Sequence, residues 1–531
     1  MNARPAFAVA AAAAVALFAV SGCAPGGSNS TSAQEAVTGG QATIAIAADP
    51  GTLNPLAGNP SPSSYQLMAI AYDHLVARTA DGKFQANLAS SWESTPTSAK
   101  FVLRDDVKCS DGSALTPSVV AKTFAWVLDK KNSSPWLGAF IPVDAKVTPD
   151  DANKTLEVTS ATPSSFLLNS LSYMPILCGS GADNPAGLAT TTSGTGMFKL
   201  TGETPGQSFT FSVRPEYVWG PAGAKASDAG VPATVTVKIV ANEATRANLL
   251  ISGDVNVTAL TGADRDRLKN QNLSKIDIPA NPGLIFFNQA AGRVGADKSI
   301  RSTLSQALDL KSIASVASGG RGQDLKSIVT GTPSVCSVDT ISGNVPSFDA
   351  ESAKKALDAA GWKAGSDGLR SKDGKALQLK FLYPSNRGTE LVAAAELIQK
   401  ELRAIGADLT LVGSDNYASV LFSGGDWDIV WGPFSTEDPS VWTILVNGAA
   451  PPNGRNFASI QNATYQAKTN EAVTNAGEES CPLWGEAEAA LIKDNDILPV
   501  VANTQTIYGN KAKFNLGILG SVDATSIRMS K

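Results

Sequence analysis

The sequence is poorest in histidine: among 531 residues there is only one, His74. A serine-histidine catalytic triad would have to use that residue, and a zinc site would have to rest on cysteines or carboxylates. His74 lies in an apolar run, residues 70–76, that is typical of a helix. We therefore predict a structural role for His74, packed or half-exposed, and no metal site.

Motifs of catalysis and cofactor binding are also missing. Residues 368–375 have the wrong spacing for a phosphate-binding loop and lack the serine or threonine that follows its lysine. Gly194 and Gly196 are not followed by the third glycine of a dinucleotide fingerprint, and no Gly-x-Ser-x-Gly, His-Glu-x-x-His or Cys-x-x-Cys pattern occurs. The sequence therefore predicts a protein that is not an enzyme and needs no cofactor.

Clusters of lysine and arginine are absent, and the formal net charge is −5 at pH 7. We therefore expect no nucleic-acid partner. The remaining composition, 43% hydrophobic and 17% charged, is that of a globular protein. At roughly 150 residues per domain, the length suggests about two to four domains.

Long apolar runs are limited to one, residues 6–20, which follows Arg4. A run of about 15 residues is short for a membrane span and typical of a signal-peptide core. Residues 20–23 resemble the bacterial lipobox, whose cysteine becomes the lipid-modified first residue of the mature protein. We predict a lipoprotein signal peptide at residues 1–22 and palmitate-type lipidation at Cys23. The alternative is an ordinary cleavage site with an incidental cysteine.

Residues 23–40 are rich in glycine, serine and threonine without periodicity, which predicts a flexible tether. The folded part would then be anchored at the extracytoplasmic face of the cell membrane. A β-like run at residues 41–47 is followed by turn residues at 49–55, and residues 64–76 favour a helix.

Residues 101–129 combine an apolar strand, a polar turn and a helix that opens at Thr116 and Pro117, a hydroxyl N-cap followed by proline. This stretch resembles the signature region of family 5 solute-binding proteins, the dipeptide, oligopeptide and nickel receptors of ABC importers; Cys109 replaces the usual aromatic residue. Further segments resemble motifs of that family in the same order along the chain: residues 193–200, 214–219, 300–308 and 356–362. The resemblance spans about residues 41–520.

The resemblance implies an α/β, two-lobed periplasmic-binding-protein-like fold of type II with an extra subdomain, in which helices flank mixed sheets and a hinge joins the lobes. The expected division is lobe I from residues 41–76, 190–280 and 498–531, an inserted subdomain at 77–189, and lobe II at 281–497. The chain would cross between the lobes near residues 280 and 498. Two such crossings make a hinge about which the lobes close on a ligand.

Four cysteines remain besides Cys23: Cys109, Cys178, Cys336 and Cys481. In an oxidising compartment they suggest two disulfides, for which three connectivities are possible. We favour Cys109–Cys178 and Cys336–Cys481 because each pair would stay within one proposed domain. Free buried thiols are the alternative.

Residues 376–412 read as a β-α-β unit, which implies parallel strands. Ligands of open α/β sheets bind beyond the carboxyl ends of the strands, where Arg387 lies. Its forked guanidinium can bind a carboxylate through two hydrogen bonds. In dipeptide-binding members of the family an arginine in the corresponding loop holds the ligand carboxylate. The alternative for Arg387 is a solvated loop charge.

A second strand, residues 427–431, ends at Trp431 and is followed by Phe434, Glu437 and Asp438. Aromatic rings and acids near a cation suit a zwitterion with an apolar middle, such as a short peptide. In dipeptide-binding members an aspartate close behind the strand-ending tryptophan holds the ligand amine, whereas here the first acids come later. Either Asp438 takes that role through a longer loop, or the ligand is not held by a free amino terminus.

Plainer roles remain open for the same residues: core packing for Trp431, and turn formation before Pro439 for Asp438. The resemblance also implies that residues 58–63 face the ligand from the other lobe. Asn59 and Ser61 are therefore added to the predicted ligand-binding residues.

We predict an extracytoplasmic binding lipoprotein, a monomer that captures short peptides between two lobes and delivers them to a membrane permease and its ATPase. Another small solute is the first alternative, for instance a glycoside, an opine-like compound or a metal chelate; bare nickel is disfavoured by the single histidine. A regulatory or scaffold lipoprotein without ligand is the second. An extracellular hydrolase has the least support.

Overall fold

The computed structural model describes residues 35–58 and 61–531, of which Ala36–Lys531 form one compact unit. The predicted signal peptide, Cys23, most of the tether and Asn59 lie outside the described residues. No helix in the described part is both long and apolar enough to cross a membrane.

The described end of the predicted tether is paired with the rest of the chain. The Val37 amide donates to the carbonyl of Met529 at 2.9 Å, and the Gly39 amide donates to that of Val231 at 3.1 Å. The folded unit therefore begins a few residues before the strand that the sequence predicts.

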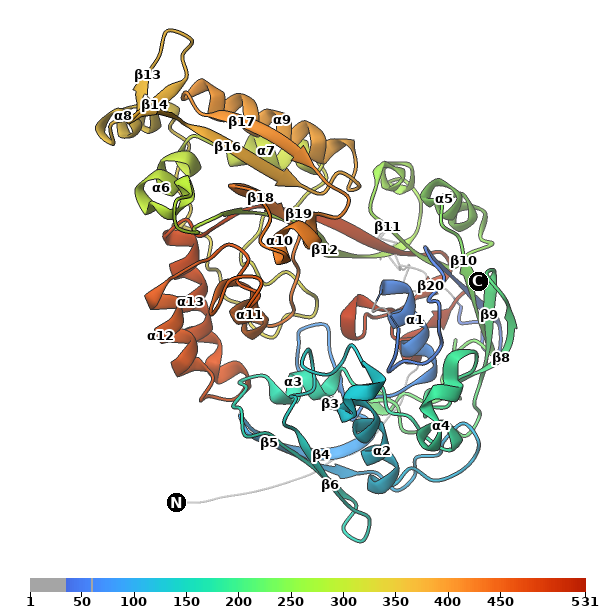
Figure 1. Cartoon of the computed structure of the whole chain (residues 1–531). Helices are drawn as coiled ribbons and strands as arrows, with labels where there is room; N and C mark the ends of the chain where they lie inside the picture. Colours follow the sequence, from blue (N-terminus) through green and yellow to red (C-terminus); the bar gives the residue numbers. More distant parts are fainter. Residues whose placement is uncertain (1–34, 59–60) are drawn as a thin grey trace, which may run out of the picture. The chain divides into compact units, whose positions relative to one another are not determined.

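The largest sheet has ten strands in the order β17-β16-β18-β12-β19-β11-β1-β10-β9-β8. Their bounds are β1 Gln41–Ile46, β8 Phe198–Thr204, β9 Ser208–Val213, β10 Thr234–Ile239, β11 Val257–Leu260, β12 Ser274–Phe287, β16 Gln378–Tyr383, β17 Asp408–Gly413, β18 Ile429–Gly432 and β19 Ile497–Gly509. β1 is parallel to β10 and β11, and β16 to β17 and β18, whereas β12 and β19 are antiparallel to each other. These two long central strands join the ends of the sheet (Figure 1).

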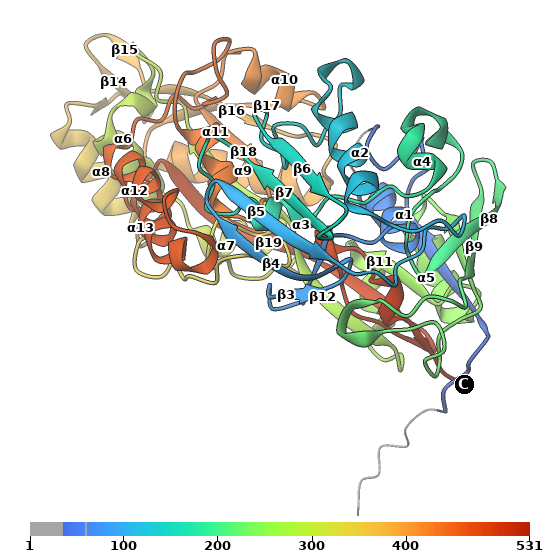
Figure 2. The same cartoon turned by 90° about the horizontal axis from the view of Figure 1, so that it is seen from below.

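One end of the chain's fold combines β1 and β8–β11 with a second sheet of order β4-β5-β7-β6. Figure 2 shows the four strands of this second sheet side by side. The elements here are α1 Pro62–Ala71, β2 Val76–Arg78, β3 Phe84–Ala86, β4 Ala89–Thr95, β5 Ser98–Leu103, α2 Pro117–Leu128, β6 Lys146–Asp150, β7 Thr155–Thr159, α3 Leu167–Ser172, α4 Ser180–Asp183 and α5 Glu243–Ser252. Ile44, Phe101, Phe124 and Phe211 belong to one continuous core that spans both sheets.

The other end is built on β16, β17 and β18, with helices on both faces. The helices are α6 Lys298–Gln306, α7 Leu310–Ala317, α8 Ala350–Ala359, α9 Thr389–Ala404, α10 Tyr417–Phe422, α11 Trp442–Val446, α12 Ala463–Ala472 and α13 Cys481–Lys493. Successive residues of a strand point to opposite faces. Accordingly, Ile285 and Phe287 of β12 pack in one core with α6–α9, and Leu284 and Phe286 pack in another with α11–α13. Short strands complete the chain: β13 Lys363–Ala364, β14 Arg370–Lys372, β15 Lys375–Ala376, β20 Ala512–Lys513 and β21 Arg528–Met529.

The predicted β-α-β unit is confirmed as β16, α9 and β17, and the predicted cap is confirmed because the Thr116 side chain accepts from the Val119 amide. The helix predicted over residues 64–76 is too long. α1 ends at Ala71, and residues 76–78 form β2, which pairs with β3. Over so few residues, a buried strand and a buried helix show the same continuous apolar pattern. His74 is buried in this connection, and its Nδ1 lies 2.9 Å from the Met174 carbonyl oxygen.

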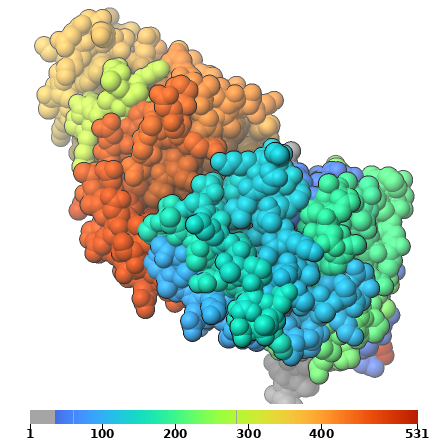
Figure 3. All heavy atoms as spheres, turned by 60° about the horizontal axis from the view of Figure 1, so that its bottom comes forward, coloured from blue at the N-terminus to red at the C-terminus, as the bar shows by residue number. Residues whose placement is uncertain are grey.

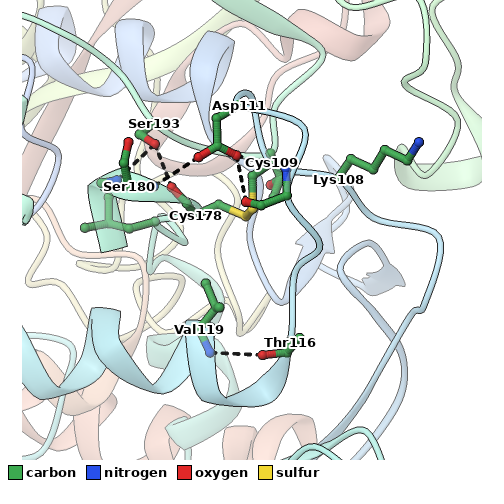
Figure 4. The surroundings of a disulfide bond; sticks show 12 residues. Lys108, Cys109, Asp111, Thr116, Val119, Cys178, Ser180 and Ser193 are labelled. Carbon is green, nitrogen blue, oxygen red and sulfur yellow. Dashed lines mark hydrogen bonds between the residues drawn. A yellow bond between two sulfur atoms is a disulfide. The ribbon is translucent and has the colours of Figure 1, made fainter. Parts of the chain in front are cut away.

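Both predicted disulfides are present. Cys109–Cys178 has a Cα–Cα distance of 5.3 Å, and Cys336–Cys481 one of 5.5 Å. Figure 4 shows Cys178 beside Ser193 and Asp111. The Ser193 hydroxyl donates to the Cys178 carbonyl, and the Ser180 amide donates to the Asp111 carboxylate. The first bridge thus fixes the turn before α2 to the segment that precedes α4.

Candidate functional site

The carboxyl ends of β16 and β18 lie side by side, because these parallel strands pair through Phe381–Ile429 and Leu382–Val430. The loops that follow them carry most of the predicted ligand-binding residues. The structure brings Arg387 and Trp431 to one small cavity of about 40 Å³, which is also lined by Asn281, Pro433 and Asn503.

Arg387 is exposed in the loop between β16 and α9. Its Nη1 donates to Oδ1 of Asn281 at 2.6 Å, a neutral partner, and among the described residues no carboxylate pairs with it. The guanidinium therefore keeps donors for an anion.

Trp431 is the third residue of β18, which begins at Ile429 and ends at Gly432 rather than at Trp431 as predicted, and its side chain is only 4% exposed. A Cβ atom at Gly283 would lie 2.1 Å from Cζ2 of this indole, so the ring rests directly on the backbone of β12. Gly283 belongs to an irregular stretch in the pairing of β12 with β19, between Ala280 and Leu284. Asn281, the partner of Arg387, lies in the same irregular stretch and has a positive φ of 43°.

Phe434 is half-buried in an aromatic cluster. Its ring centroid lies 5.4 Å from that of Phe457, 6.0 Å from that of Phe286 and 6.4 Å from that of Trp442. The tilted and edge-on arrangements are those that aromatic pairs prefer. This cluster gives the loop after β18 a fixed, apolar flank.

Glu437 contacts residues from the other end of the fold. The Tyr173 hydroxyl donates to its Oε2, Arg78 Nη1 lies 3.8 Å from the same oxygen, and Arg78 Nη1 also donates to the Tyr173 hydroxyl at 2.7 Å. The Arg78 side chain is fully buried, and that of Glu437 is 14% exposed. Burial raises the pKa of Glu437 to about 7, although Tyr173 and Arg78 both favour the ionised form.

Asp438 is buried beside it and caps the short helix η6, Pro439–Val441, by accepting from the Ser440 amide at 2.9 Å. Its other oxygen faces Nδ2 of Asn169 at 3.5 Å. Burial raises the pKa of Asp438, against the hydrogen bonds of Ser440. The turn-forming role is thus present, together with a contact to α3.

Ser61 caps α1, since its hydroxyl accepts from the Ser64 amide while Ser64 closes the reciprocal bond of a capping box. One turn further, burial and the charge of Glu437 raise the pKa of Tyr65 to about 12. Ser61 thus has a structural role at the start of α1.

Sequence reasoning missed Arg78, Tyr173 and Asn169. They come from a three-residue strand, from the residue after α3 and from α3 itself, and no local pattern marks them, because their partners lie more than 260 residues away in the chain. Buried polar atoms in this neighbourhood also lack a hydrogen-bond partner among the described residues: Arg78 Nη2, Asn169 Oδ1, Thr436 Oγ1 and Trp442 Nε1. Buried polar groups are normally satisfied, so these are candidate ligand contacts.

A second contact, like that of Glu437 with Tyr173, joins residues 77–189 to residues 281–497. Ser165 donates through its hydroxyl to the Ala472 carbonyl at 2.8 Å and accepts from Trp484 Nε1 at 3.2 Å. Phe166 packs on Trp484 with ring centroids 6.0 Å apart, beside Cys481. Figure 3 shows a teal segment of the chain lying against an orange-red one.

Metal ligands are not grouped here: in residues 35–58 and 61–531 no set of three or more His, Cys, Asp or Glu side chains is arranged to hold an ion. Together, the fold and the candidate site are typical of a solute-binding protein.

The chain belongs to the bacterial extracellular solute-binding proteins of family 5: residues 83–456 match the model of that family's middle region. The family and the fold class that the sequence predicts are thus confirmed. The chain is 27% identical to Protein XP55 of Streptomyces lividans over 406 residues, covering 73% of this chain and 67% of that protein. It is 27% identical to the nickel-binding periplasmic protein of Escherichia coli over 404 residues, covering 70% of this chain and 71% of that protein.

Solved structures share the fold. The oligopeptide-binding protein AppA of Bacillus subtilis, in complex with a nonapeptide, superposes with a TM-score of 0.68 at 19% identity, covering 94% of this chain and all of that one. NikA of Brucella suis, in complex with Fe(III)-EDTA, superposes with a TM-score of 0.75 at 21% identity, covering 92% of this chain and all of that one.

Proposed function

We propose that the protein is the substrate-binding lipoprotein of an ABC importer that captures short peptides between two lobes and delivers them to a membrane permease. The observation that carries this proposal is the exposed guanidinium of Arg387 beside Trp431, at the carboxyl ends of two parallel strands. Family membership supports solute binding outside the cytoplasm, and the curated relatives include oligopeptide-binding proteins of Mycobacterium and Bacillus.

The ligand contacts that we propose divide by chemistry. Arg387 would bind the peptide carboxylate, since its present partner, Asn281, carries no charge. Trp431 and Phe434 would flank the apolar middle, and Ser61 and Asn59 would approach from lobe I. Glu437 and Asp438, the predicted amine contacts, are held by other residues of the chain in this structure.

The proposed lobes are residues 41–76, 190–280 and 498–531 with the insert 77–189, and residues 281–497. β12 and β19 are the strands that pass between them, and the irregular pairing near residue 280 lies close to one proposed crossing. A ligand that contacts both lobes would stabilise the closed form, which the permease and its ATPase read.

Lipid anchoring through Cys23 is part of the proposal and rests on the apolar run before it. A membrane-anchored chain should carry a diacylglyceryl and acyl mass on its first residue. Mass spectrometry of the native mature protein should detect this added mass, and an unmodified native amino terminus would contradict the anchor. Cell fractionation is the second test, in which Cys23→Ala should release the protein from the membrane fraction.

The binding proposal is tested by isothermal calorimetry with di- to pentapeptide mixtures. Arg387→Ala should lower peptide affinity by about 10- to 100-fold, because a charge-assisted pair is lost. Arg403→Ala is the matched control, since Arg403 is also exposed but lies at the far end of α9, paired with Asp408. If no peptide binds to the native protein, the peptide proposal fails.

A further inference from the structure

The two acids of the loop after β18 are the feature from which a narrower substrate class follows. We propose that Glu437 and Asp438 bind the protein's own Arg78, Tyr173 and Asn169 rather than a ligand ammonium group. The site would then take carboxylate ligands with an apolar body whose amino group is blocked or absent. This inference rests on the proposed function of the same site and narrows its ligand.

One carboxylate oxygen of Glu437 is already held by other residues of the chain. Its Oε2 already accepts from Tyr173 and faces Arg78, and the carboxyl group is largely buried. An incoming ammonium would have to displace the phenol and would compete with a guanidinium whose side chain is fully buried. A buried cation that loses its counterion is strongly unfavourable, so the existing pair is favoured over the exchange.

Asp438 is held in a similar way. One carboxylate oxygen accepts from the Ser440 amide, which fixes the start of η6, and the other faces Asn169. An ammonium bound here would also lie in the neighbourhood of Arg78, whose charge acts on both acids. Two cations in one buried cluster repel each other, which disfavours amine-bearing ligands further.

The loop itself is fixed by backbone contacts that hold the acids toward their present partners. The Gly331 amide donates to the Thr436 carbonyl at 2.7 Å, and the Val335 amide donates to the Glu437 carbonyl at 3.0 Å. A Cβ atom at Gly331 would lie 2.3 Å from Cγ of Glu437, so the acid packs directly on this backbone. Turning either carboxylate toward a ligand would require this packed segment to move.

The open hydrogen-bonding capacity of the region is mostly that of donors. Arg387 presents donors at the strand ends, and the buried atoms without a partner among the described residues are two donors, Arg78 Nη2 and Trp442 Nε1, one hydroxyl, Thr436 Oγ1, and one acceptor, Asn169 Oδ1. Donors recognise carboxylate and carbonyl oxygens, which suits the acid end and the amides of a ligand. Arg387 and Trp431, which line one cavity, fit the carboxylate and the apolar body of such a ligand.

The experiment compares three forms of one tetrapeptide mixture by competition calorimetry: unmodified, N-acetylated and C-amidated. The inference predicts that N-acetylation changes affinity by less than about threefold, while C-amidation lowers it by at least about tenfold. Loss of binding on N-acetylation would overturn the inference and leave the peptide proposal standing.

A thermodynamic cycle measures whether the Glu437 carboxylate contributes to binding of the ligand ammonium group. With Glu437→Gln, the ratio of affinities for the unmodified and N-acetylated mixtures should stay as in the native protein, because no ammonium contacts residue 437. A ratio that falls by about tenfold or more, the worth of a charged hydrogen bond, would show an amine contact. Glu396→Gln, an exposed acid on α9, is the control, and thermal unfolding verifies that each variant is folded.

Two small probes separate the inference from the peptide proposal. N-acetylphenylalanine carries only the carboxylate, and phenylalanine amide carries only the amine. If no peptide binds but N-acetylphenylalanine does, in an Arg387-dependent manner, the peptide proposal fails and the ligand class stands. Binding of phenylalanine amide alone, or of neither probe and no peptide, would overturn the ligand class.

Discussion

At the scale of single residues, the carboxyl group of Glu437 has the clearest consequence for solution behaviour. Its pKa is raised from 4.5 to about 7, mainly by burial, and the groups that face it are Tyr173, Arg78, Asp438 and Tyr65. An acid whose pKa is higher in the folded state binds its proton more tightly there than in the unfolded chain. Its contribution to stability is therefore fully present below pH 4.5 and is lost as the pH rises through 7.

Glu437→Gln should remove this pH dependence. Between pH 5 and pH 8 the native protein should lose stability relative to the variant by at most about 3 kcal/mol, which is the linkage value of the shift. Chemical unfolding of both proteins across that range measures the difference. Parallel stability curves for the two proteins would contradict a raised pKa at this residue.

At the scale of elements, the irregular pairing of β12 near residue 280 connects two of the predicted ligand residues. Asn281 accepts from Arg387, and Gly283 supports the ring of Trp431. Glycine is required at position 283 because a methyl group there would overlap the indole. The position of Trp431 is thus set by a strand that pairs with both β18 and β19.

Gly283→Ala should displace Trp431, destabilise the protein by about 1–3 kcal/mol as overpacking does, and weaken ligand binding. Gly202→Ala in β8 is the control, because its new methyl would meet only an ordinary contact at 3.7 Å from Thr210 and no positive φ is involved. Denaturant unfolding and calorimetry measure the two effects. Equal behaviour of both variants would contradict the close contact.

Sequence periodicity was sufficient for some elements and not for others. β16, α9 and β17 could be predicted because alternation and helical spacing are local signals, and they located Arg387 at a strand end. The helix predicted over residues 64–76 runs past the end of α1 because a buried strand and a buried helix look alike over a few apolar residues. Arg78, Tyr173 and Asn169 could not be found, since only the tertiary fold brings them to Glu437 and Asp438.

At the scale of the whole molecule, contacts other than ligand contacts join residues 77–189 to residues 281–497. Besides the groups around Glu437, Ser165 and Phe166 bind Ala472 and Trp484 next to the disulfide Cys336–Cys481. Phe166 is only 1% exposed, so separating the two parts would expose an aromatic ring to water. If the two parts separate as the proposed lobes, these contacts would favour the closed form even before a ligand is bound.

Phe166→Ala should therefore shift the ligand-free protein toward an open form and lower apparent ligand affinity, since part of the protein must first close. Small-angle scattering should show a larger radius of gyration for the variant than for the native protein. Phe348→Ala is the control, because Phe348 is 53% exposed. An unchanged radius of gyration without ligand would contradict a role of Phe166 in closure.

The backbone deformation between residues 280 and 284 has one more consequence. Arg387 contacts this stretch through Asn281, and the ring of Trp431 packs on Gly283, two residues further along. A ligand that binds Arg387 would compete with Asn281 for the guanidinium, on the strand that we propose connects the two lobes. If the proposed lobes close by bending this strand, ligand binding and closure act on the same peptide units. Ligands that bind more tightly should then also favour closure more strongly.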